Sequence, residues 1–314
     1  MPRPPVKGRI IDGHVHLLAR RHADVWFEAA DHFGLDHFIT QSPLEEAVLL
    51  QRDFGHRLTF VAVPNWMKLA EPNAGEDWLR RIEAFHNLGA RMAKIHLSPG
   101  TMQRTKFRFD HPTIQRVLKE IRDRGMIIMT HIGDPQIWYE GRYRKLDKPE
   151  EAFLADRTEQ YRLWEEALEA SRGTPWLGAH LGGWPENLGY LQGLFDRFPD
   201  LVLDLSATRW MVRELSTRRD EARDFILRNP TRILWGSDQV SGDARDWDFL
   251  ASRWWCHRKL FETGYADVTP ILDPDLPDDQ QPVLRGLALP GPTLQLLYRE
   301  NARALMGKVG VTIE

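Results

Sequence analysis

The chain alternates between short apolar stretches and longer segments with helical spacing, and this alternation recurs eight times. Each short stretch has the length of a strand, and in each segment after it the apolar residues lie three and four apart. The predicted strands cover residues 9–17, 35–40, 59–63, 91–96, 126–132, 176–181, 201–205 and 232–235. The predicted helices cover 23–33, 42–54, 76–88, 113–124, 157–171, 185–198, a segment ending near 229, and 246–261. This order predicts an α/β fold, a (β/α)8 TIM barrel with long strand-end loops, as a single domain over residues 1–314.

Polar side chains recur at the C-terminal ends of these predicted strands. They are His14, His16, Lys94, His96, His131, His180, Asp204 and, just past the last strand, Asp238. TIM-barrel enzymes carry their chemistry at this end of the strands. A doubly wound open sheet accommodates the same alternation, but it does not explain why polar residues recur at one end of so many strands. The pattern therefore favours a barrel with an active site at the strand ends.

The first strand carries two histidines separated by one residue. Side chains on a strand alternate between its faces, so Asp12, His14 and His16 share one face. Two imidazoles in this arrangement can bind one divalent cation. The alternative is a pair of buried histidines that only make hydrogen bonds.

Composition limits the classes of partner. The net charge of −3 gives no field that would attract nucleic acid or an anionic membrane, so the expected partner is a small-molecule substrate. No apolar run reaches transmembrane length, and no apolar segment follows the first residues as a signal peptide requires. The single cysteine, Cys256, excludes an intrachain disulfide, and a cytoplasmic location is expected. The Pro- and Asp-rich segment 265–292 is expected to run over the surface. It could there contact a neighbouring subunit of a homo-oligomer, and the sequence does not decide this.

Several of these strand ends match a known pattern over residues 9–307. The stretches are Ile11-Asp12-Gly13-His14-Val15-His16, Thr130-His131-Ile132-Gly133, Ala179-His180-Leu181-Gly182-Gly183, Asp204-Leu205-Ser206-Ala207, Leu234-Trp235-Gly236-Ser237-Asp238 and a closing helix at 300–305. The sequence resembles the amidohydrolase superfamily, in particular its amidohydrolase-2 branch of decarboxylases and lactonases. It departs from that branch after Asp238, where Gln239 and Val240 replace the aromatic residue and proline that are often found there.

The resemblance implies a role for each strand-end residue. It makes His14, His16, His131 and Asp238 the ligands of one divalent metal, and His180 a catalytic neighbour. Three imidazoles and a carboxylate with a position left for water suit Zn2+ first, and also Mn2+, Fe2+ or Co2+. Zinc lowers the pKa of bound water to about 7, Asp238 can accept its proton, and His180 can orient the substrate carbonyl. For His131 and His180 the alternative is a histidine of the core or of the metal's surroundings.

Lys94 has two interpretations. In two-metal members of the superfamily a lysine on the fourth strand carries CO2 as a carbamate that bridges the metals, whereas the decarboxylase-like branch has one metal and no carbamate. Lys94 would then hold a substrate carboxylate, or extend outward to solvent. One metal is favoured. His96 is expected to be a polar strand-end residue, with a substrate contact as the alternative.

Loops after the strands are expected to set specificity. Trp66, Arg142 in the long 133–156 loop, and Arg209 are candidate contacts for a flat, anionic substrate, although such side chains often only pack a loop down. Three functions stay open: a hydrolase of a lactone, amide or ester, a non-oxidative decarboxylase of an aromatic or unsaturated acid, and a barrel that binds without turnover. The hydrolase is preferred.

Overall fold

In the computed structural model, residues 6–143 and 156–314 are described, and the chain divides into two compact units. Unit 1 comprises residues 1–59 and 204–314, and unit 2 comprises residues 60–203. The single domain over residues 1–314 stays a prediction. The 144–155 part of the predicted strand-end loop, with Arg144, and the first five residues lie outside the described residues.

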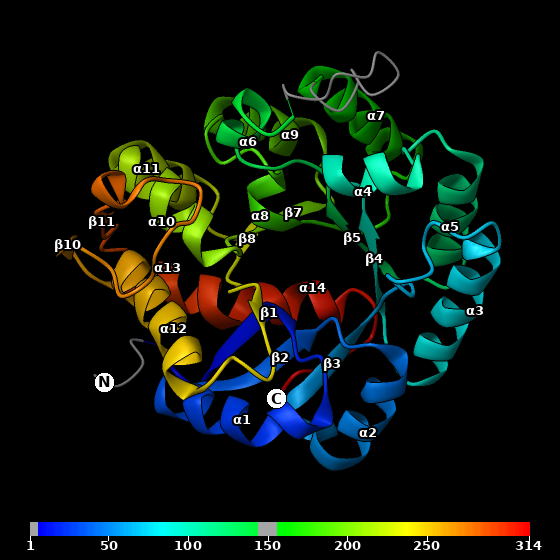
Figure 1. Ribbon diagram of the computed structural model, residues 1–314, viewed down its shortest axis with the longest axis horizontal. Helices are drawn as coiled ribbons and strands as arrows, with labels where there is room; N and C mark the ends of the chain where they lie inside the picture. Colours follow the sequence, from blue (N-terminus) through cyan, green and yellow to red (C-terminus); the bar gives the residue numbers. More distant parts are fainter. Residues whose placement is uncertain (1–5, 144–155) are drawn as a thin grey trace. The chain divides into compact units, whose positions relative to one another are not determined.

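Unit 1 is built from parallel strands and the helices that follow them (Figure 1). β1 pairs with β2 on one side and with β9 on the other, both in parallel. The first part of the chain contributes β1 (Ile10–His16), η1 (Arg20–His22), α1 (Ala23–His32), β2 (Leu35–Thr40), α2 (Leu44–Phe54) and η2 (Gly55–Arg57). The second part contributes α10 (Thr208–Thr217), α11 (Arg219–Arg228), β8 (Ile233–Leu234), β9 (Gln239–Val240), α12 (Trp247–Glu262), β10 (Ala266–Asp267), η4 (Asp278–Gln280), β11 (Leu284–Arg285), α13 (Gly291–Gln295), the π-helical turn η5 (Leu296–Glu300) and α14 (Asn301–Gly307).

Large aromatic side chains fill the core of unit 1. Trp26 of α1 packs edge-on against Trp254 of α12, with ring centroids 5.4 Å apart. Trp235 packs in the same way against Tyr298, and its backbone N–H donates to Leu297. The closing helix predicted at 300–305 is therefore confirmed as α14, which together with η5 packs on β8.

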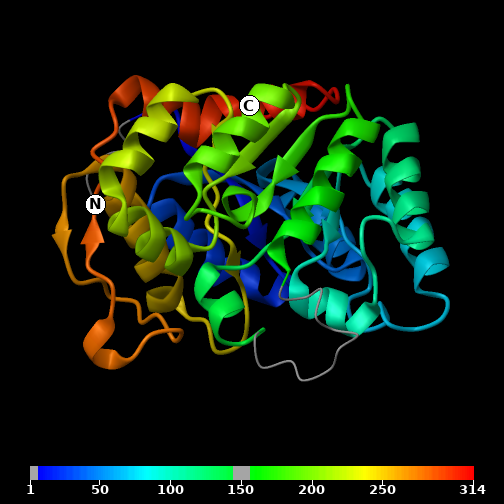
Figure 2. The same cartoon turned by 90° about the horizontal axis from the view of Figure 1, so that it is seen from above.

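The segment 265–292 forms a short antiparallel pair, β10 with β11. Figures 1 and 2 show it beside α10 and α12, and β11 contacts both helices. Ser216 accepts a hydrogen bond from the Arg285 backbone at 3.0 Å. The predicted surface segment is thus fixed to its own unit, and its contact with a second subunit stays a prediction.

Unit 2 repeats the strand-then-helix order. Its strands pair in parallel and in sequence order, β3–β4, β4–β5, β5–β6 and β6–β7. The elements are β3 (Leu58–Ala62, which begins in unit 1), α3 (Ala74–Asn87), β4 (Met92–His96), α4 (Pro99–Thr105), α5 (Pro112–Asp123), β5 (Ile127–His131), α6 (Gln136–Glu140), α7 (Arg157–Ala170), β6 (Trp176–Gly178), α8 (Ala179–Gly182), α9 (Leu188–Arg197) and β7 (Leu201–Asp204, whose last residue belongs to unit 1). Helices α3 and α5 pack on each other, and Trp78, Trp164 and Trp176 are fully buried.

Most predicted elements are confirmed, and two predictions are wrong in detail. The helix expected to end near residue 229 is two helices, α10 and α11, because Arg218 between them has a non-helical backbone. The strand predicted over 176–181 ends at Gly178, because His180 and Leu181 adopt left-handed backbone angles. Parallel pairing of strands that neighbour each other in sequence, with helices between them, is the pattern expected for a (β/α)8 barrel.

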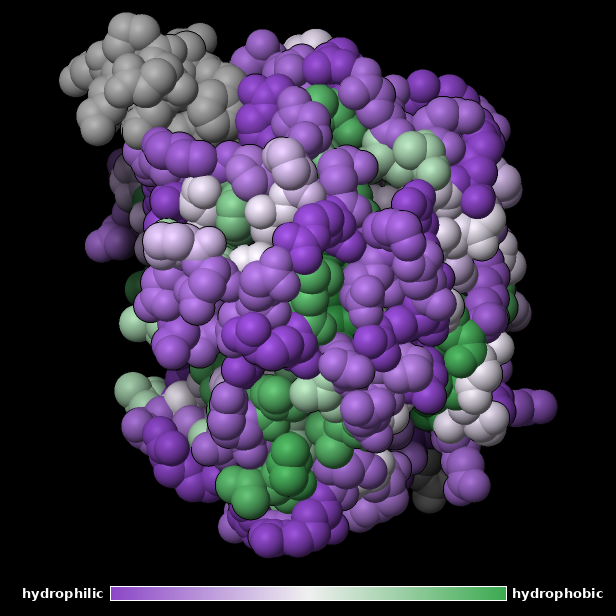
Figure 3. All heavy atoms as spheres, turned by 90° about the vertical axis from the view of Figure 1, so that its right-hand side faces the viewer, coloured by the Kyte–Doolittle hydropathy of each residue, from purple (hydrophilic) through white to green (hydrophobic). Residues whose placement is uncertain are grey.

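The surface is mainly polar on the face drawn in Figure 3, where apolar side chains appear in small groups between hydrophilic ones. A surface of this kind is ordinary for a globular protein. Among the described residues, no helix is both long and apolar enough to cross a membrane.

Candidate metal centre and strand-end residues

His14, His16 and Asp238 come together in unit 1. His14 and His16 leave the end of β1 with ring centroids 5.6 Å apart. Asp238 Oδ1 lies 3.0 Å from His16 Nε2 and 3.4 Å from His14 Nε2. One ligand atom from each of the three residues lies within 4.8 Å of the others, which is close enough to share one cation. The predicted grouping of these three side chains is therefore present.

Access to this group is uneven. The His14 side chain is 1% exposed, whereas the side chains of His16 and Asp238 are 22% and 28% exposed. Structural metal sites are closed, but catalytic sites keep a position that solvent or substrate can reach. The exposure of His16 and Asp238 is that of an accessible site.

Asp204 and Ser206 orient His14. His14 Nδ1 donates to Asp204 Oδ2 at 2.9 Å, and Ser206 Oγ lies 3.0 Å from the same nitrogen. Because the carboxylate accepts a hydrogen bond from Nδ1–H, a neutral His14 carries its lone pair on Nε2, which faces Asp238. A lone pair and a carboxylate oxygen 3.4 Å apart form an electron-rich pair that a cation stabilises. The sequence pattern predicted that Asp204 lies at a strand end, but it did not predict a function for this residue.

Asp12 holds the segment that carries Asp238. Its carboxylate accepts from the backbone and hydroxyl of Ser237, at 2.9 and 2.6 Å, and from Trp254 Nε1 at 3.2 Å. Burial raises the pKa of Asp12 to about 7, and these hydrogen bonds act in the opposite direction. Gly236 allows the close approach, because a Cβ there would lie 2.8 Å from the Cβ of His14. Asp238 then takes a left-handed backbone, and its N–H donates to the His14 carbonyl.

His131 lies between two other histidines in unit 2. Its ring centroid is 4.4 Å from that of His96 and 4.6 Å from that of His180. His131 Nε2 donates to Asp134 Oδ1 at 3.0 Å, and Tyr143 donates to Asp134 Oδ2 at 2.6 Å. Sequence reasoning missed Asp134, although it follows His131 by only three residues.

His180 sits in an unusual turn. Four consecutive residues, 180 to 183, have positive φ angles of 58, 50, 62 and 72°. Gly183 is essential to this turn, because a Cβ there would lie 2.5 Å from the Gly133 carbonyl oxygen. Left-handed backbone at a non-glycine residue costs free energy and is concentrated at functional sites.

The remaining predicted residues differ in their surroundings. Lys94 is 1% exposed on β4, which is contrary to the expectation that it extends outward to solvent. The Trp66 ring centroid lies 5.5 Å from that of His96. The Arg142 guanidinium packs 3.9 Å over the Trp138 ring, which is the loop-packing alternative. Arg209 is exposed on the first turn of α10.

Similar structures define the fold. A TIM-barrel protein from Bordetella bronchiseptica is 14% identical, with a TM-score of 0.57 over 96% of this chain and 99% of that one. A probable 2-pyrone-4,6-dicarboxylic acid hydrolase from Acinetobacter baumannii is 10% identical, with a TM-score of 0.54 over 95% and 99%. A 2,6-dihydroxybenzoate decarboxylase from Rhizobium is 15% identical, with a TM-score of 0.51 over 96% and 99%. The chain is thus a TIM barrel, as predicted, with a His–His–Asp group at its strand ends.

The family follows from the sequence. The amidohydrolase family model matches residues 57–308. The chain therefore belongs to the amidohydrolase family, which is a family of enzymes. A search of curated proteins found no match. The matched range contains His131, His180, Asp204 and Asp238, whereas His14 and His16 precede it.

Proposed function

We propose that the protein is a metal-dependent hydrolase that opens a lactone, amide or ester of a small anionic substrate. The main support for the proposal is the group of His14, His16 and Asp238. His14 is hydrogen-bonded to Asp204. Two imidazoles and a carboxylate are ligands that Zn2+ accepts, and Mn2+, Fe2+ and Co2+ accept them too. His131 is proposed as a further ligand, as the resemblance implies. The proposed location is the cytoplasm.

Each side chain of the group has a distinct task in this proposal. A divalent ion bound there supplies Lewis acidity and makes a water molecule acidic enough to react near neutral pH. Asp238 accepts a proton from that water and returns it to the leaving group. His180 orients the substrate carbonyl, and Asp204 keeps the lone pair of His14 on Nε2.

The substrate is proposed to be a small molecule with negative charge. Arg209 is exposed at the start of α10, where its charge can reach an anion. Trp66 and Arg142 are weaker candidates for substrate contact, because Trp66 packs beside His96 at the end of β4 and Arg142 packs on Trp138 of its own loop region. The name of the Acinetobacter neighbour, a probable hydrolase of a pyrone dicarboxylate, supports this class of substrate.

The alternative is a non-oxidative decarboxylase of an aromatic or unsaturated acid. The Rhizobium neighbour, named as a dihydroxybenzoate decarboxylase, supports it. In that reaction Asp238 and His180 would deliver a proton to the carbon that loses CO2. Family membership as an enzyme leaves little support for a barrel that binds without turnover.

A paired assay separates these reactions. The purified protein is tested on a lactone panel and a carboxylated-aromatic panel, with and without Zn2+ or Mn2+. Acid release without CO2 supports the hydrolase, and CO2 release supports the decarboxylase. Asp238→Asn abolishes either activity, whereas Asp224→Asn, an exposed change on α11, leaves it intact. Equal activity of Asp238→Asn and the wild type would refute the role of Asp238, and absence of turnover on both panels would refute both reactions.

Metal content tests the number of ions. We expect one equivalent of metal in protein purified without added metal. Two equivalents would favour a carbamate on the buried Lys94 instead.

A further inference from the structure

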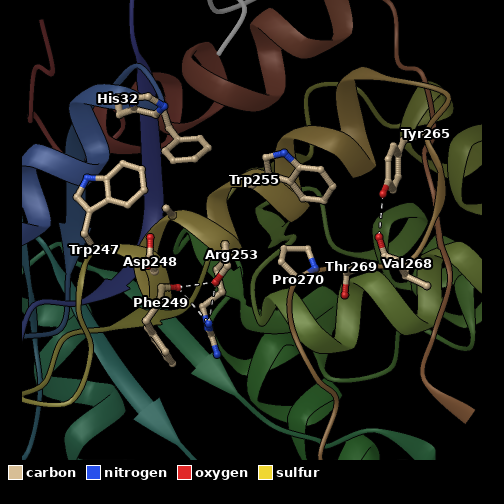
Figure 4. Close-up of a pocket in the computed structure, with 13 residues that line it drawn as sticks. His32, Trp247, Asp248, Phe249, Arg253, Trp255, Tyr265, Val268, Thr269 and Pro270 are labelled. Atoms are coloured by element: carbon tan, nitrogen blue, oxygen red, sulfur yellow. Dashed lines mark hydrogen bonds between the residues drawn. The ribbon is translucent and has the colours of Figure 1, made fainter. Parts of the chain in front are cut away.

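Two arginines pack on one phenylalanine close to the end of β9. Arg253 lies one turn after Phe249 on α12, with its Cζ 3.4 Å from the Phe249 ring centroid, and the Cζ of Arg245 lies 5.0 Å from the same centroid. Arg245 Nη1 donates to the Val240 carbonyl at 2.6 Å. Arg253 Nη1 donates to the Phe249 carbonyl at 3.0 Å (Figure 4). Both guanidinium groups are therefore held in place.

These two half-buried arginines lack carboxylate partners of the kind that the buried Arg213 and Arg258 have. Arg258, further along the same helix, donates to Glu262 through both Nε and Nη2. Arg213 forms an ion pair with Asp273. Among the described residues, neither Arg245 nor Arg253 forms an ion pair, and the Nε and Nη2 of Arg253 have no protein acceptor.

Positive charge accumulates here. Burial lowers the pKa of Arg253 to about 10, and the neighbouring charges of Arg209 and Arg245 lower it as well. The pKa of Arg245 is lowered first by burial, while Asp238 raises it and Arg209 lowers it. Arg245 and Arg253, which share the Phe249 ring, thus place two positive charges close together. Arg209 adds to the positive field on both, and Asp238 is the negative charge that acts on Arg245. An anion bound to such a cluster offsets the repulsion between the cations.

A cavity adjoins Arg253. It has a volume of about 940 Å3, and its walls include Phe249, Trp247, Trp255 and Tyr265 (Figure 4). This volume suits a small organic molecule. The charged side chains of the lining are Arg253 and the exposed Asp248, and the aromatic walls beside Arg253 favour a ring that carries an anionic substituent.

We infer that Arg245 and Arg253 form an anion subsite that binds a carboxylate of a small ring-containing acid, with Phe249 as its supporting ring. Forked guanidinium groups bind carboxylates through paired hydrogen bonds, and the donors that Arg253 leaves unused suit that geometry. Identifying this acid as the substrate rests on the proposed function. Binding of the carboxylate itself needs no metal.

The test is carboxylate binding by metal-free protein. Protein dialysed against a chelator is titrated by calorimetry with phthalate, and with benzamide as an uncharged ring. We expect phthalate to bind and benzamide to bind far more weakly. Arg253→Gln and Arg245→Gln are each expected to weaken phthalate binding about tenfold or more, because hydrogen bonds to charged groups are among the stronger ones. Arg223→Gln on α11, which removes the same charge elsewhere, is expected to leave the affinity unchanged.

Thermal unfolding without ligand checks that the variants fold. Loss of one of the two like charges that share Phe249 should keep or raise the unfolding midpoint, whereas loss of a structural arginine would lower it. Absence of phthalate binding in the wild type, equal binding by all variants, or an equal loss in Arg223→Gln would overturn the subsite. An inactive enzyme that still shows the expected binding pattern would refute the proposed function alone, and an active enzyme without that pattern would refute the subsite alone.

Discussion

At the scale of single residues, Asp204 is the most informative side chain to change. It is fully buried, and it binds His14 on the nitrogen opposite the one that faces Asp238. Asp204→Asn replaces a carboxylate with a neutral amide that can also donate, so His14 loses the partner that fixes its tautomer. Loss of such a partner typically lowers metal affinity about 10- to 100-fold. We expect a loss of that size in a zinc titration against a competing chelating dye.

The control for Asp204 is a carboxylate that touches no functional residue. Asp224→Asn, which is exposed on α11, should keep the affinity of the wild type. If Asp204→Asn also binds zinc as tightly as the wild type does, then Asp204 does not orient a metal ligand.

At the scale of elements, the left-handed turn at residues 180 to 183 can be tested by a pair of changes. Gly183→Ala puts a Cβ 2.6 Å from the Gly133 backbone nitrogen and forces alanine to φ 72°. We expect it to lower the free energy of unfolding by more than about 2 kcal/mol. His180→Gly relieves left-handed strain, which is worth about 1–2 kcal/mol per residue, and should abolish activity without loss of stability. Urea unfolding measures both changes.

Gly193 offers a matched control for the alanine change. It lies within α9, and a Cβ there meets no atom within 4 Å. Gly193→Ala should therefore stabilise the protein slightly, by up to about 1 kcal/mol. Equal effects of Gly183→Ala and Gly193→Ala would mean that the turn tolerates a side chain.

The elements themselves were largely predictable because their signals are local. Apolar spacing located β1 to β8, but it did not predict the two-residue strands β9, β10 and β11, and periodicity carries no information on left-handed backbone. The end of β6 was therefore missed, although Gly182 and Gly183 were an available turn signal. The functional contacts were less predictable than the elements. The role of Asp204 depends on a contact between residues 190 positions apart in the sequence, which no local pattern encodes. The spacing of Phe249 and Arg253 is visible in the sequence, whereas the lack of an ion pair to Arg253 within the described part of the chain is a tertiary property.

At the scale of the whole molecule, overall charge and local field differ. A net charge of −3 argued against large anionic partners, yet it gave no sign of the positive cluster around Arg253. Net charge is a sum over the whole chain, whereas binding of a small anion depends on the few charges within reach of it. The strand-end pattern was more informative than composition, because a barrel brings strand ends together whatever the sequence between them.

Stability of the whole molecule should also depend on pH through the buried His37. Burial lowers the pKa of His37 to about 4, and its Nε2 lies 2.8 Å from Thr59 Oγ1. As the pH falls below the ordinary value of 6.5, the unfolded chain binds a proton that folded His37 does not, so acid favours unfolding. From pH 7 to 5 the wild type should lose about 2 kcal/mol of unfolding free energy through this group. His37→Gln removes this pH dependence. The difference in unfolding free energy between the wild type and His37→Gln, measured by urea unfolding, should therefore shrink by this amount from pH 7 to 5. Other titrating groups, Asp12 among them, contribute to both proteins and cancel in the difference. Parallel stability curves for the two proteins would show that His37 takes up a proton as readily in the folded state as in the unfolded one.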